Sequence, residues 1–582
     1  MLIKFIMKKY FVITFLLFTK ISLAQSPLPI PPLLSGTNFN LTIQNGVTQF
    51  YPGINTPTYG INGNLLAPTL LFKKGDVVTL NVTNTLTGNG NATTIHWHGL
   101  HVPASADGGP HQLINQGTTW QPSFKVLNNA ATFWYHPHGM NKTDLHVAKG
   151  IAGLIIVKDT IESKINLPRT YGVDDFPIII QTKDFDILHQ IAISTQTDTA
   201  HMVNGVVNPY LDAPSQVIRL RLLNGSSGRT FMLGFSNNMN FHLIATDGGL
   251  LDSSQSMNRI QLSNGERAEI LVDFSMFSGG NIYLKNFGSE LAHGIQGADS
   301  VGDNSINFIP DYYTNPLNGS DYDLLKINFT APTSSPVITI PAALTPLSVI
   351  PISSATFNRN FVFDTITEMG NVPNFAAGPF AINQKLFEMD SINETVYLNT
   401  TETWTLINRT MVAHPFHIHD VEFLIVDING KLPPAYEKGW KDVVLVMPGD
   451  TIRFITKFED FADDHIPYMY HCHVLHHEDD GMMGSFIVID TTKNGVHELT
   501  RNTDGISIYP NPCNDELRIT MDELRWKNSK LEVIDLLGHV LVMKEVFEIK
   551  NSSINIHNLS NGIYFLKITS NNNIITKKFE KE

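Results

Sequence analysis

Apolar and polar residues alternate with a period of two along most of the chain. Val78, Leu80 and Val82 point to one face of an extended segment, while the polar residues between them point to the other. The same pattern returns around Trp404 and Leu406. Turn residues separate these runs, and segments with helical periodicity are scarce. The pattern predicts an all-β chain made of β-sandwich domains.

Two segments far apart in the chain follow the same order of features. In each, an aromatic residue precedes a His-X-His pair, a glycine-containing bend follows, and a strand ends the unit. The first runs from Trp134 to Asp159 and the second from Met469 to Asp490. Another His-X-His pair lies upstream of each, at 96–98 and 417–419. This repetition predicts two domains with one plan.

The other segments suggest how the rest of the chain is divided. Between Tyr171 and Phe329 the residues have strand character but form no His-X-His pair, which predicts a domain that spaces the other two. A stretch rich in proline, serine and threonine predicts a linker. The predicted divisions are a signal peptide at 1–24, domains at 25–165 and 166–330, a linker at 331–354, a third domain at 355–495 and a C-terminal module at 503–582.

Length and composition agree with this organisation. A chain of 582 residues is too long for one compact core, and 42% hydrophobic with 16% charged residues is typical of folded proteins. Two cysteines cannot form a disulfide framework, whereas 22 histidines is a large number for a chain with so few thiols. A histidine-rich metal site is the first hypothesis.

The N-terminus has the features of a signal peptide. Lysines precede an apolar run at Tyr10–Phe18, and small residues suited to cleavage follow at Ser22–Ala24. The run has about half the ~20 residues that a membrane span needs. Removal of residues 1–24, which hold four lysines and no acid, moves the formal net charge from −14 to −18. We expect a soluble, exported protein whose acidity argues against nucleic acid as a partner.

Histidine pairs are the main candidates for chemistry. One His-X-His pair on a strand is a weak signal, because alternation points both rings to one face whether or not they bind a metal. Four pairs in two duplicated units favour a metal cluster where the first and third domains meet, with four imidazoles from each. These pairs are His96 and His98, His136 and His138, His417 and His419, and His471 and His473.

A second candidate site surrounds Cys472. Two imidazoles, a thiolate and a weakly bound thioether are the ligands of a blue-copper electron-transfer site, and His414, Cys472, His477 and Met482 supply that set. A lone cysteine is more often a buried core residue. This one, however, lies between histidines that are themselves predicted to bind metal.

Alternation along the strand links the two sites. Cys472 should point toward the blue copper while His471 and His473 point toward the cluster. Electrons could then pass one at a time from the thiolate through adjacent peptides. Four coppers would hold the four electrons that reduce dioxygen to two waters.

The motifs His-Trp-His-Gly, His-Pro-His, His-Pro-Phe-His-Ile-His and His-Cys-His-x3-His-x4-Met resemble the four copper-binding motifs of multicopper oxidases. The resemblance covers roughly Leu41 to Asp490. It implies three cupredoxin-like Greek-key β-sandwich domains, besides the small C-terminal β-sandwich module. The segments at 171–177, 439–443 and 477–483 look like the bacterial laccase branch, which includes cuprous oxidases and bilirubin-oxidase-like enzymes.

The resemblance also implies roles for single residues. His96 and His417 would hold a type 2 copper, while His414, Cys472, His477 and Met482 would hold type 1. Asp107 and Glu478 resemble the family's proton-relay acids; the simpler readings are a turn residue and a surface acid. The two type 3 coppers would be held by one set of His98, His136 and His473 and another of His138, His419 and His471.

Substrates remain open in this comparison. Cuprous oxidases have Asp and Met before the His-Pro-Phe-His motif, where this chain has Thr410 and Val412, and it has no methionine-rich insert. A laccase-like activity is favoured, in which O2 oxidises a small-molecule reducing substrate such as a phenol or an aromatic amine. Oxidation of copper(I) or manganese(II), or a bilirubin-oxidase-like activity, is the alternative. A copper-free structural role, as in some family members, is disfavoured because every ligand position is filled.

The C-terminal module resembles the sorting domain of the type IX secretion system. It opens with Tyr-Pro-Asn-Pro at 509–512 and ends with Asn-Gly-x-Tyr-x-x-Lys-Ile at 561–568. The resemblance implies the type IX machinery as a partner, and passage across an outer membrane followed by release or attachment at the cell surface. We expect the protein to be a monomer. A β-sandwich for adhesion or carbohydrate binding is the alternative.

Six histidines off the ligand spacing are expected in supporting or surface positions: His101, His111, His146, His242, His465 and His476.

Overall fold

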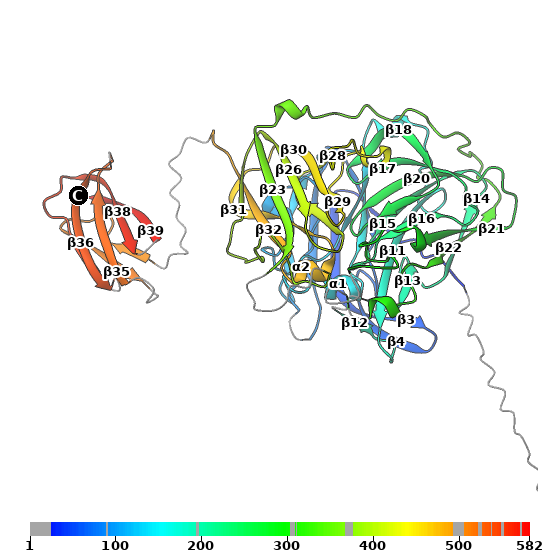
Figure 1. Ribbon diagram of the computed structural model, residues 1–582, viewed down its shortest axis with the longest axis horizontal. Coiled ribbons are helices and arrows are strands. Elements are labelled where there is room, and N and C mark those ends of the chain that lie inside the picture. Colours follow the sequence, from blue (N-terminus) through cyan, green and yellow to red (C-terminus); the bar gives the residue numbers. More distant parts are fainter. Residues whose placement is uncertain are drawn as a thin grey trace, which may run out of the picture. The chain divides into compact units, whose positions relative to one another are not determined.

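The protein is almost entirely β-structure, as predicted (Figure 1). Within the described residues the chain forms two compact units, which divide after Thr491. The predicted signal peptide at 1–24 lies outside the described residues. The computed structural model describes residues 25–88, 91–193, 197–302, 309, 311–366, 376–492, 506–521, 527–536, 538–548, 552–570 and 573–582.

The first sandwich packs two sheets around a core that includes Phe39, Leu80 and Phe133. Alternation explains its strands, since residues of β6 (Val77–Asn84) are buried at every second position. The remaining strands of its larger sheet are β3 (Asn38–Tyr51), β4 (Ile54–Ile61), β7 (Thr119–Trp120) and β8 (Ser123–Lys125); the smaller sheet holds β2 (Leu33–Ser35), β5 (Thr69–Lys73), β9 (Ala131–Tyr135) and β10 (Gly153–Lys158).

The second sandwich has the longest sheets and a core that includes Leu220 and Phe235. One sheet holds β14 (Pro209–Pro214), β16 (Phe231–Phe235), β19 (Ile260–Leu262), β21 (Asn281–Phe287) and β22 (Asp321–Thr330); the other holds β11 (Asp175–Phe185), β12 (Ile191–Ala192), β13 (Ala200–Val203), β15 (Val217–Asn224), β17 (Phe241–Thr246), β18 (Gly249–Met257) and β20 (Arg267–Asp273). The central strands of its larger sheet, β11, β15 and β20, are buried on both faces, whereas β21 and β22 of the other sheet are exposed at several positions.

The third sandwich encloses Trp404, Phe416 and Tyr470 between its two sheets. One sheet holds β23 (Phe357–Thr365), β24 (Phe380–Ile382), β26 (Thr400–Asn408), β28 (Phe423–Ile428) and β30 (Thr451–Phe458); the other holds β25 (Glu394–Tyr397), β27 (His414–Ile418), β29 (Val443–Val446), β31 (Asp463–Cys472) and β32 (Met483–Ile489).

One buried asparagine repeats in all three sandwiches. Asn84, Asn224 and Asn408 each end a strand that pairs in parallel with a strand from earlier in the chain, and each side-chain oxygen accepts a bond from the backbone N–H two residues later. Parallel pairing of non-consecutive strands fits a Greek-key connection. The amide of each donates to two backbone carbonyls: those of Asn91 and Ile114, of Arg229 and Leu262, and of Val412 and Val446.

Two segments join the sandwiches along their edges. Strand β1 (Ser26–Pro27) pairs with β14, so the start of the described chain adds a strand to the second sandwich. The predicted linker at 331–354 lies along the second sandwich rather than free of it: Val337 O accepts from Val217 N at 2.9 Å and Leu344 N donates to Asp252 O at 2.9 Å. The predicted domain boundaries themselves stay predictions.

Helices are few and short. Helices α1 (Thr143–Lys149) and α2 (Leu475–Asp479) follow the second histidine pair of the first and third sandwiches and lie side by side (Figure 1). Among the described residues, no helix has the length and apolar character to cross a membrane. The 3₁₀ turns are η1 (Ala104–Ala106), η2 (Glu162–Lys164), η3 (Gly288–Glu290), η4 (Tyr312–Thr314), η5 (Ile352–Ser354) and η6 (Ala435–Glu437).

The C-terminal unit is a small sandwich with its own core, which includes Leu517, Leu531 and Leu566. This agrees with the predicted β-sandwich module. Its three-stranded sheet holds β33 (Ile506–Tyr509), β34 (Glu516–Met521) and β37 (Ser552–Asn555); its four-stranded sheet holds β35 (Lys527–Ile534), β36 (Val540–Glu548), β38 (Gly562–Ser570) and β39 (Asn573–Lys581).

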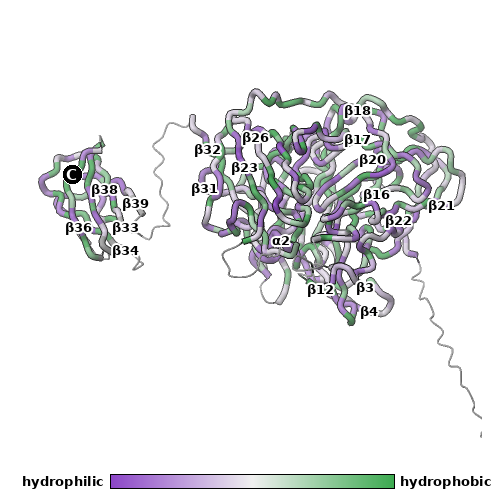
Figure 2. Tube along the Cα trace, viewed as in Figure 1, coloured by the Kyte–Doolittle hydropathy of each residue, from purple (hydrophilic) through white to green (hydrophobic). Residues whose placement is uncertain are grey.

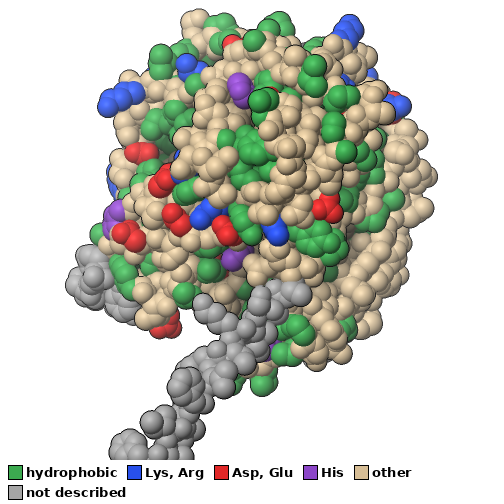
Figure 3. Space-filling view, turned by 90° about the vertical axis from the view of Figure 1, so that its right-hand side faces the viewer, with side chains coloured by type: hydrophobic (Ala, Val, Ile, Leu, Met, Phe, Trp, Pro, Cys, Tyr) green, Lys and Arg blue, Asp and Glu red, His purple; other side chains and the backbone are tan. Residues whose placement is uncertain are grey.

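The hydropathy of the chain alternates along the strands, as a sandwich fold requires (Figure 2). On the face drawn in Figure 3, acidic and basic side chains are scattered among polar and apolar ones. That face shows no continuous basic surface of the kind that nucleic-acid binding uses.

Candidate metal centre

The eight histidines of the four pairs converge where the first and third sandwiches meet. Each has at most 1% of its surface exposed. The two halves are built alike: His96 and His136 exchange backbone hydrogen bonds in the first sandwich, and His417 lies opposite His471 in the third. Rings from the two sandwiches stack on each other, with centroids 3.8 Å apart for His96 and His419 and 3.7 Å apart for His98 and His417.

Within this cluster the ring nitrogens form small groups that could each hold one ion. In each group, ligand atoms lie within 4.8 Å of one another, and both predicted type 3 sets are brought together: His98, His136 and His473 in one, and His138, His419 and His471 in the other. The predicted type 2 pair, His96 and His417, forms a third group with His419.

The second site lies in the third sandwich. Cys472 Sγ is 3.4 Å from His414 Nδ1 and 3.6 Å from His477 Nδ1. Met482 is buried beside them, and its carbonyl accepts a bond from Cys472 N at 3.1 Å. Met483 instead packs against Phe387 and Met469. The structure therefore gathers the four predicted type 1 residues on one loop and its neighbouring strand.

Alternation at the end of β31 separates the two sites. Cys472 faces His414 and His477, whereas His471 Nε2 lies 3.1 Å from His138 Nε2 in the cluster. His473 also faces the cluster, with its ring 4.9 Å from that of His98. Three consecutive residues thus connect both sites through two peptide bonds.

Several ring nitrogens in these sites are buried without a hydrogen-bond partner. Among the described residues they include Nε2 of His96, His417 and His477 and both nitrogens of His473. The outer nitrogens of several of these rings donate to oxygens, as His96 Nδ1 does to Asp107 O at 2.9 Å. Because unsatisfied buried polar atoms are costly, inward lone pairs without donors fit metal ions, and imidazole with thiolate suits copper.

Burial keeps histidines of both sites in the neutral state that suits metal ligands. It lowers the pKa of His414, His136 and His419 to about 3 each, with further lowering by nearby histidine charges. The rings are therefore neutral near pH 7 and their lone pairs are available. Burial raises the pKa of the Cys472 thiol, so a bound cation would be needed to hold the thiolate.

Asp107 links the two sandwiches at the cluster. Its Oδ2 accepts a bond from His419 Nδ1 at 2.7 Å, and its Oδ1 lies 3.4 Å from His96 Nδ1. Burial acts to raise the pKa of Asp107, but His419 and His96 lower it below its ordinary value. A role as a turn residue alone therefore does not account for the contacts of the Asp107 carboxylate with His419 and His96.

Glu478 is likewise buried against the cluster and is no surface acid. Its Oε2 lies 3.2 Å from His471 Nδ1, its Oε1 lies 3.4 Å from His138 Nδ1, and the Thr143 hydroxyl donates to Oε1 at 2.7 Å. Burial opposes its ionisation, yet the two histidines hold its pKa below the ordinary value. A cavity of about 100 Å³ lies beside it, lined also by Met140 and Asp480.

Two polar contacts to predicted ligand histidines were not predicted from the sequence. Thr410 Oγ1 lies 2.8 Å from His414 Nε2, and Asp442 Oδ1 lies 3.1 Å from His98 Nε2. Asp442 falls within the 439–443 segment that resembles bacterial laccases, which was the available signal. The contact between Asp442 and His98 could not be predicted, because the two residues are 344 positions apart in the sequence.

The six histidines off the ligand spacing belong to none of the metal-binding groups among the described residues. His101 pairs with Asp420 at 2.7 Å, and His146 Nδ1 lies 3.0 Å from the Thr93 hydroxyl oxygen. His465 is exposed. These three histidines therefore lie in supporting or surface positions, as predicted.

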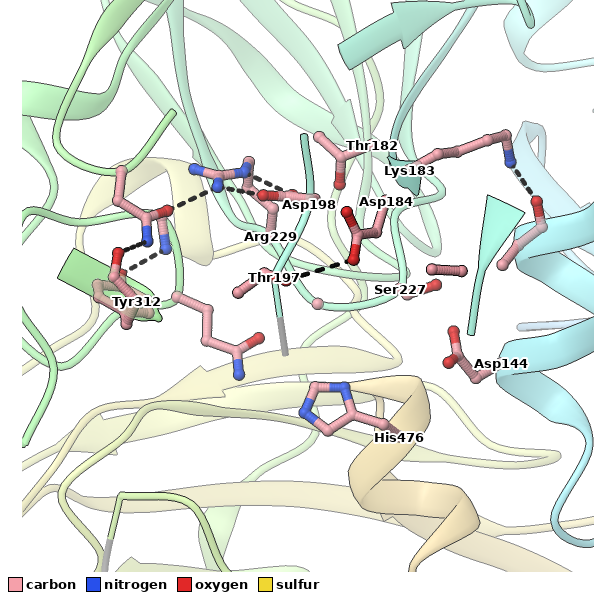
Figure 4. Close-up of a pocket in the computed structure, with 16 residues that line it drawn as sticks. Asp144, Thr182, Lys183, Asp184, Thr197, Asp198, Ser227, Arg229, Tyr312 and His476 are labelled. Carbon is pink, nitrogen blue, oxygen red and sulfur yellow. Dashed lines mark hydrogen bonds and ion pairs between the residues drawn. The ribbon is translucent and has the colours of Figure 1, made fainter. Parts of the chain in front are cut away.

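A polar cavity lies beside His476, the neighbour of His477 on α2 (Figure 4). Its lining includes Asp144 from α1, Lys183 from β11 and Arg229 from the second sandwich. Arg229 is bound to Asp198. Lys183, by contrast, is buried and donates to Ala148 O at 2.6 Å.

We expect Lys183→Met to stabilise the copper-free protein at pH 6 by roughly 2 to 4 kcal/mol. Burial lowers the pKa of Lys183 from 10.5 to about 7. At pH values between these two pKa values, the unfolded chain binds more protons than the folded chain, so the free energy of unfolding of the wild type rises with pH. Below about pH 7 the buried charge of Lys183 destabilises the folded protein by its full amount. Denaturant unfolding should show that the stability gained by Lys183→Met over the wild type is smaller at pH 10 than at pH 6. The control variant Lys164→Met, at an exposed lysine, should show no such dependence on pH. A pH-independent advantage would contradict the assignment.

Three family models match the chain. Two are described as multicopper oxidase and match residues 42–162 and 356–492. The third is described as a secretion system C-terminal sorting domain and matches residues 507–582. The first two matches contain all twelve predicted metal ligands.

Similar proteins span most of the chain. A multicopper oxidase of Staphylococcus haemolyticus is 35% identical over 462 residues, 78% of this chain and 88% of its own length. The cell division protein FtsP of Escherichia coli is 31% identical over 482 residues, 80% of this chain and 93% of its own length. A solved laccase-like multicopper oxidase from Ochrobactrum sp. has a TM-score of 0.69 and 33% identity, covering 80% of this chain and 100% of that one.

Proposed function

Because the chain belongs to the multicopper oxidase family, we propose that it is a laccase-like oxidase that couples one-electron oxidation of phenols or aromatic amines to the four-electron reduction of O2 to water. The observation that carries the proposal is the convergence of eight buried histidines beside a separate Cys472 site, with both sites joined by consecutive residues of β31.

We further propose four coppers in this arrangement. The type 1 ion would be held by His414, Cys472, His477 and Met482, and the type 2 ion by His96 and His417. When bound, copper would supply one-electron redox chemistry and a place for O2 to react. The type 3 ions would be held by His98, His136 and His473, and by His138, His419 and His471.

The protein's own residues would organise this chemistry. Oxygens fix the outer nitrogens of ligand rings, as the carbonyl of Asp442 does for His417 Nδ1 at 2.8 Å, so that the inner nitrogens face the ions. The peptides that join His471, Cys472 and His473 provide a short covalent route between the sites. Burial of all three excludes water from that route.

Asp107 and Glu478 would each supply protons to the cluster. Both are held as carboxylates by neighbouring histidines, so each must take up a proton before it can donate one. For Glu478, the adjoining cavity and the Thr143 hydroxyl offer a route by which water could deliver it.

Phenolic substrates are supported by the solved Ochrobactrum oxidase, which acts on lignin model compounds and lignosulfonate. Oxidation of copper(I) or manganese(II) and a bilirubin-oxidase-like activity are the alternatives. A structural role is suggested by the relative named as a cell division protein. The filled and converging ligand positions favour the enzyme over that role.

Copper analysis and oxygen uptake would test the proposal. The reconstituted protein should contain about four coppers per chain and consume O2 with phenols faster than with bilirubin, copper(I) or manganese(II). A preference for a metal ion would replace the phenol assignment with that alternative. Far fewer than four coppers with no oxygen uptake would reject an oxidase function for the protein.

We also propose that the protein is exported through the type IX secretion system to the cell surface or medium, as a monomer. The sorting-domain match and the separate C-terminal core support this.

Deletion of residues 506–582 should leave active enzyme inside the outer membrane, because the sorting signal is lost while the main unit keeps its own cores. Oxidase activity in medium and cell fractions measures this. As a matched control, residues 493–582 placed after an exported carrier protein should carry it into the medium or onto the surface. Normal secretion of the deleted enzyme would count against the assignment.

A further inference from the structure

The second sandwich, predicted only to space the other two, reaches the histidine cluster. The turn before β20 places Gly265 against His473 with a positive φ of 81°, and a Cβ built there would lie 2.9 Å from the His473 ring. Only glycine allows this approach without strain. The backbone of the second sandwich thus touches a cluster histidine directly.

Arg267, two residues further on, joins all three sandwiches. It is buried, and all five of its N–H groups are used. Its guanidinium forms a bidentate ion pair with Asp442 of the third sandwich, with NH1 2.7 Å from Oδ1 and NH2 2.5 Å from Oδ2. The other donations go to Thr132 O of the first sandwich and to Gly265 O and Asp247 O of the second, at 3.1, 2.9 and 3.2 Å.

Asp442 passes this support to the cluster. Its carboxylate Oδ1 accepts from His98 Nε2 at 3.1 Å, while its backbone carbonyl accepts from His417 Nδ1 at 2.8 Å. One residue therefore orients a histidine of each metal-binding sandwich. The rings of these two histidines are the pair that stacks at 3.7 Å.

The hydrogen bond also sets which nitrogen His98 presents. With its Nε2 proton donated to Asp442, the free lone pair is on Nδ1, which lies 3.4 Å from His136 Nε2. His417 has the other tautomer: it donates through Nδ1 and leaves Nε2 without a hydrogen-bond partner. Without Asp442, the His98 ring could present either nitrogen.

No side chain fits at the adjoining position. Gly99 has a φ of 82°, and a Cβ there would lie 2.3 Å from Asp442 Oδ2 and 2.8 Å from Arg267 NH2. The close fit leaves the paired groups little freedom to rotate.

We propose that Arg267 is a positioning residue for the cluster: through Asp442 it fixes the ring and tautomer of His98, which makes the second sandwich part of the metal centre. The proposal rests on the proposed copper cluster. It concerns the histidine cluster alone, since none of the five hydrogen bonds of Arg267 goes to a residue of the Cys472 site. Loss of such outer partners lowers metal affinity about 10- to 100-fold.

Arg267→Gln tests the proposal. We expect the blue absorption of the Cys472 site to stay at the wild-type level while copper bound by the cluster, and its absorption and electron paramagnetic resonance signals, fall with an affinity loss of about 10- to 100-fold. Arg267→Lys keeps the charge and should recover part of the cluster. The matched control is Arg219→Gln, since Arg219 is a buried arginine of the same sandwich that pairs with Glu269 and Glu162 and no histidine. It should load fully.

A charge left unpaired in the interior could prevent Arg267→Gln from folding. The double variant Arg267→Leu with Asp442→Leu removes both charges, an exchange that buried pairs often tolerate. It should fold and bind type 1 copper, yet lose the cluster signals. Wild-type cluster affinity in either variant, or an equal loss in Arg219→Gln, would overturn the proposal. If wild-type protein itself binds no cluster copper, the proposed function fails instead.

Discussion

Cys472→Ser should abolish the blue absorption and the steady-state oxidase activity together, while the histidine cluster still binds its coppers. A serine hydroxyl is a hard, weakly acidic group that replaces the soft thiolate poorly as a copper ligand. His414 and His477 would remain in place, since their rings are held by burial and by Phe380, whose ring lies 4.7 Å and 4.6 Å from theirs. Copper content, the visible spectrum and oxygen uptake measure the result.

The chain offers a matched control for this change. Cys513, its second cysteine, is also buried but lies in the core of the C-terminal unit. Cys513→Ser should keep both the blue colour and the turnover rate. Turnover near the wild-type rate in Cys472→Ser would mean that electrons enter the cluster by another route.

Asp107→Asn should keep all four proposed coppers but slow turnover by roughly 100-fold or more, within the range that general acid–base groups contribute. The asparagine oxygen can still accept from His419 Nδ1, so the ligand ring stays oriented. The amide cannot take up and release a proton near neutral pH. Single-turnover mixing of the reduced enzyme with O2 should place the slow step after oxygen has reacted with the cluster.

A second buried aspartate separates charge loss from proton supply. Asp174 accepts a bond from Thr170 N at 2.7 Å and contacts no histidine, so Asp174→Asn should leave turnover close to wild type. An unchanged rate in Asp107→Asn would remove that residue from the mechanism. Copper loss in Asp107→Asn would instead make Asp107 a structural support of His419.

Local patterns predicted much of the fold and of both sites. Period-two alternation predicted the all-β class. The histidine pairs, the Cys472 loop and His414 include all twelve predicted ligands, which the structure brings into two sites. Their metal binding stays a prediction. These patterns succeed because neighbouring residues in a strand must point to opposite faces, a property of the backbone alone.

Repeats were predicted less completely. Asn84 and Asn408 each precede a histidine pair in the sequence, whereas Asn224 leads to a loop without histidines. Its amide nonetheless makes the same set of backbone bonds. A repeat that carries no chemistry is visible only when the strands are seen paired.

By itself, the sequence determined which side chains share a strand face, and therefore which histidines could act as pairs and why Cys472 faces away from its neighbours. The tertiary structure alone decided which pairs meet across the sandwiches, that Asp107 reaches His419, and that Arg267 reaches Asp442. The difference is physical. Backbone geometry acts between adjacent residues, but a contact between residues 175 or 312 positions apart depends on how whole sheets pack, and no short segment of sequence records that.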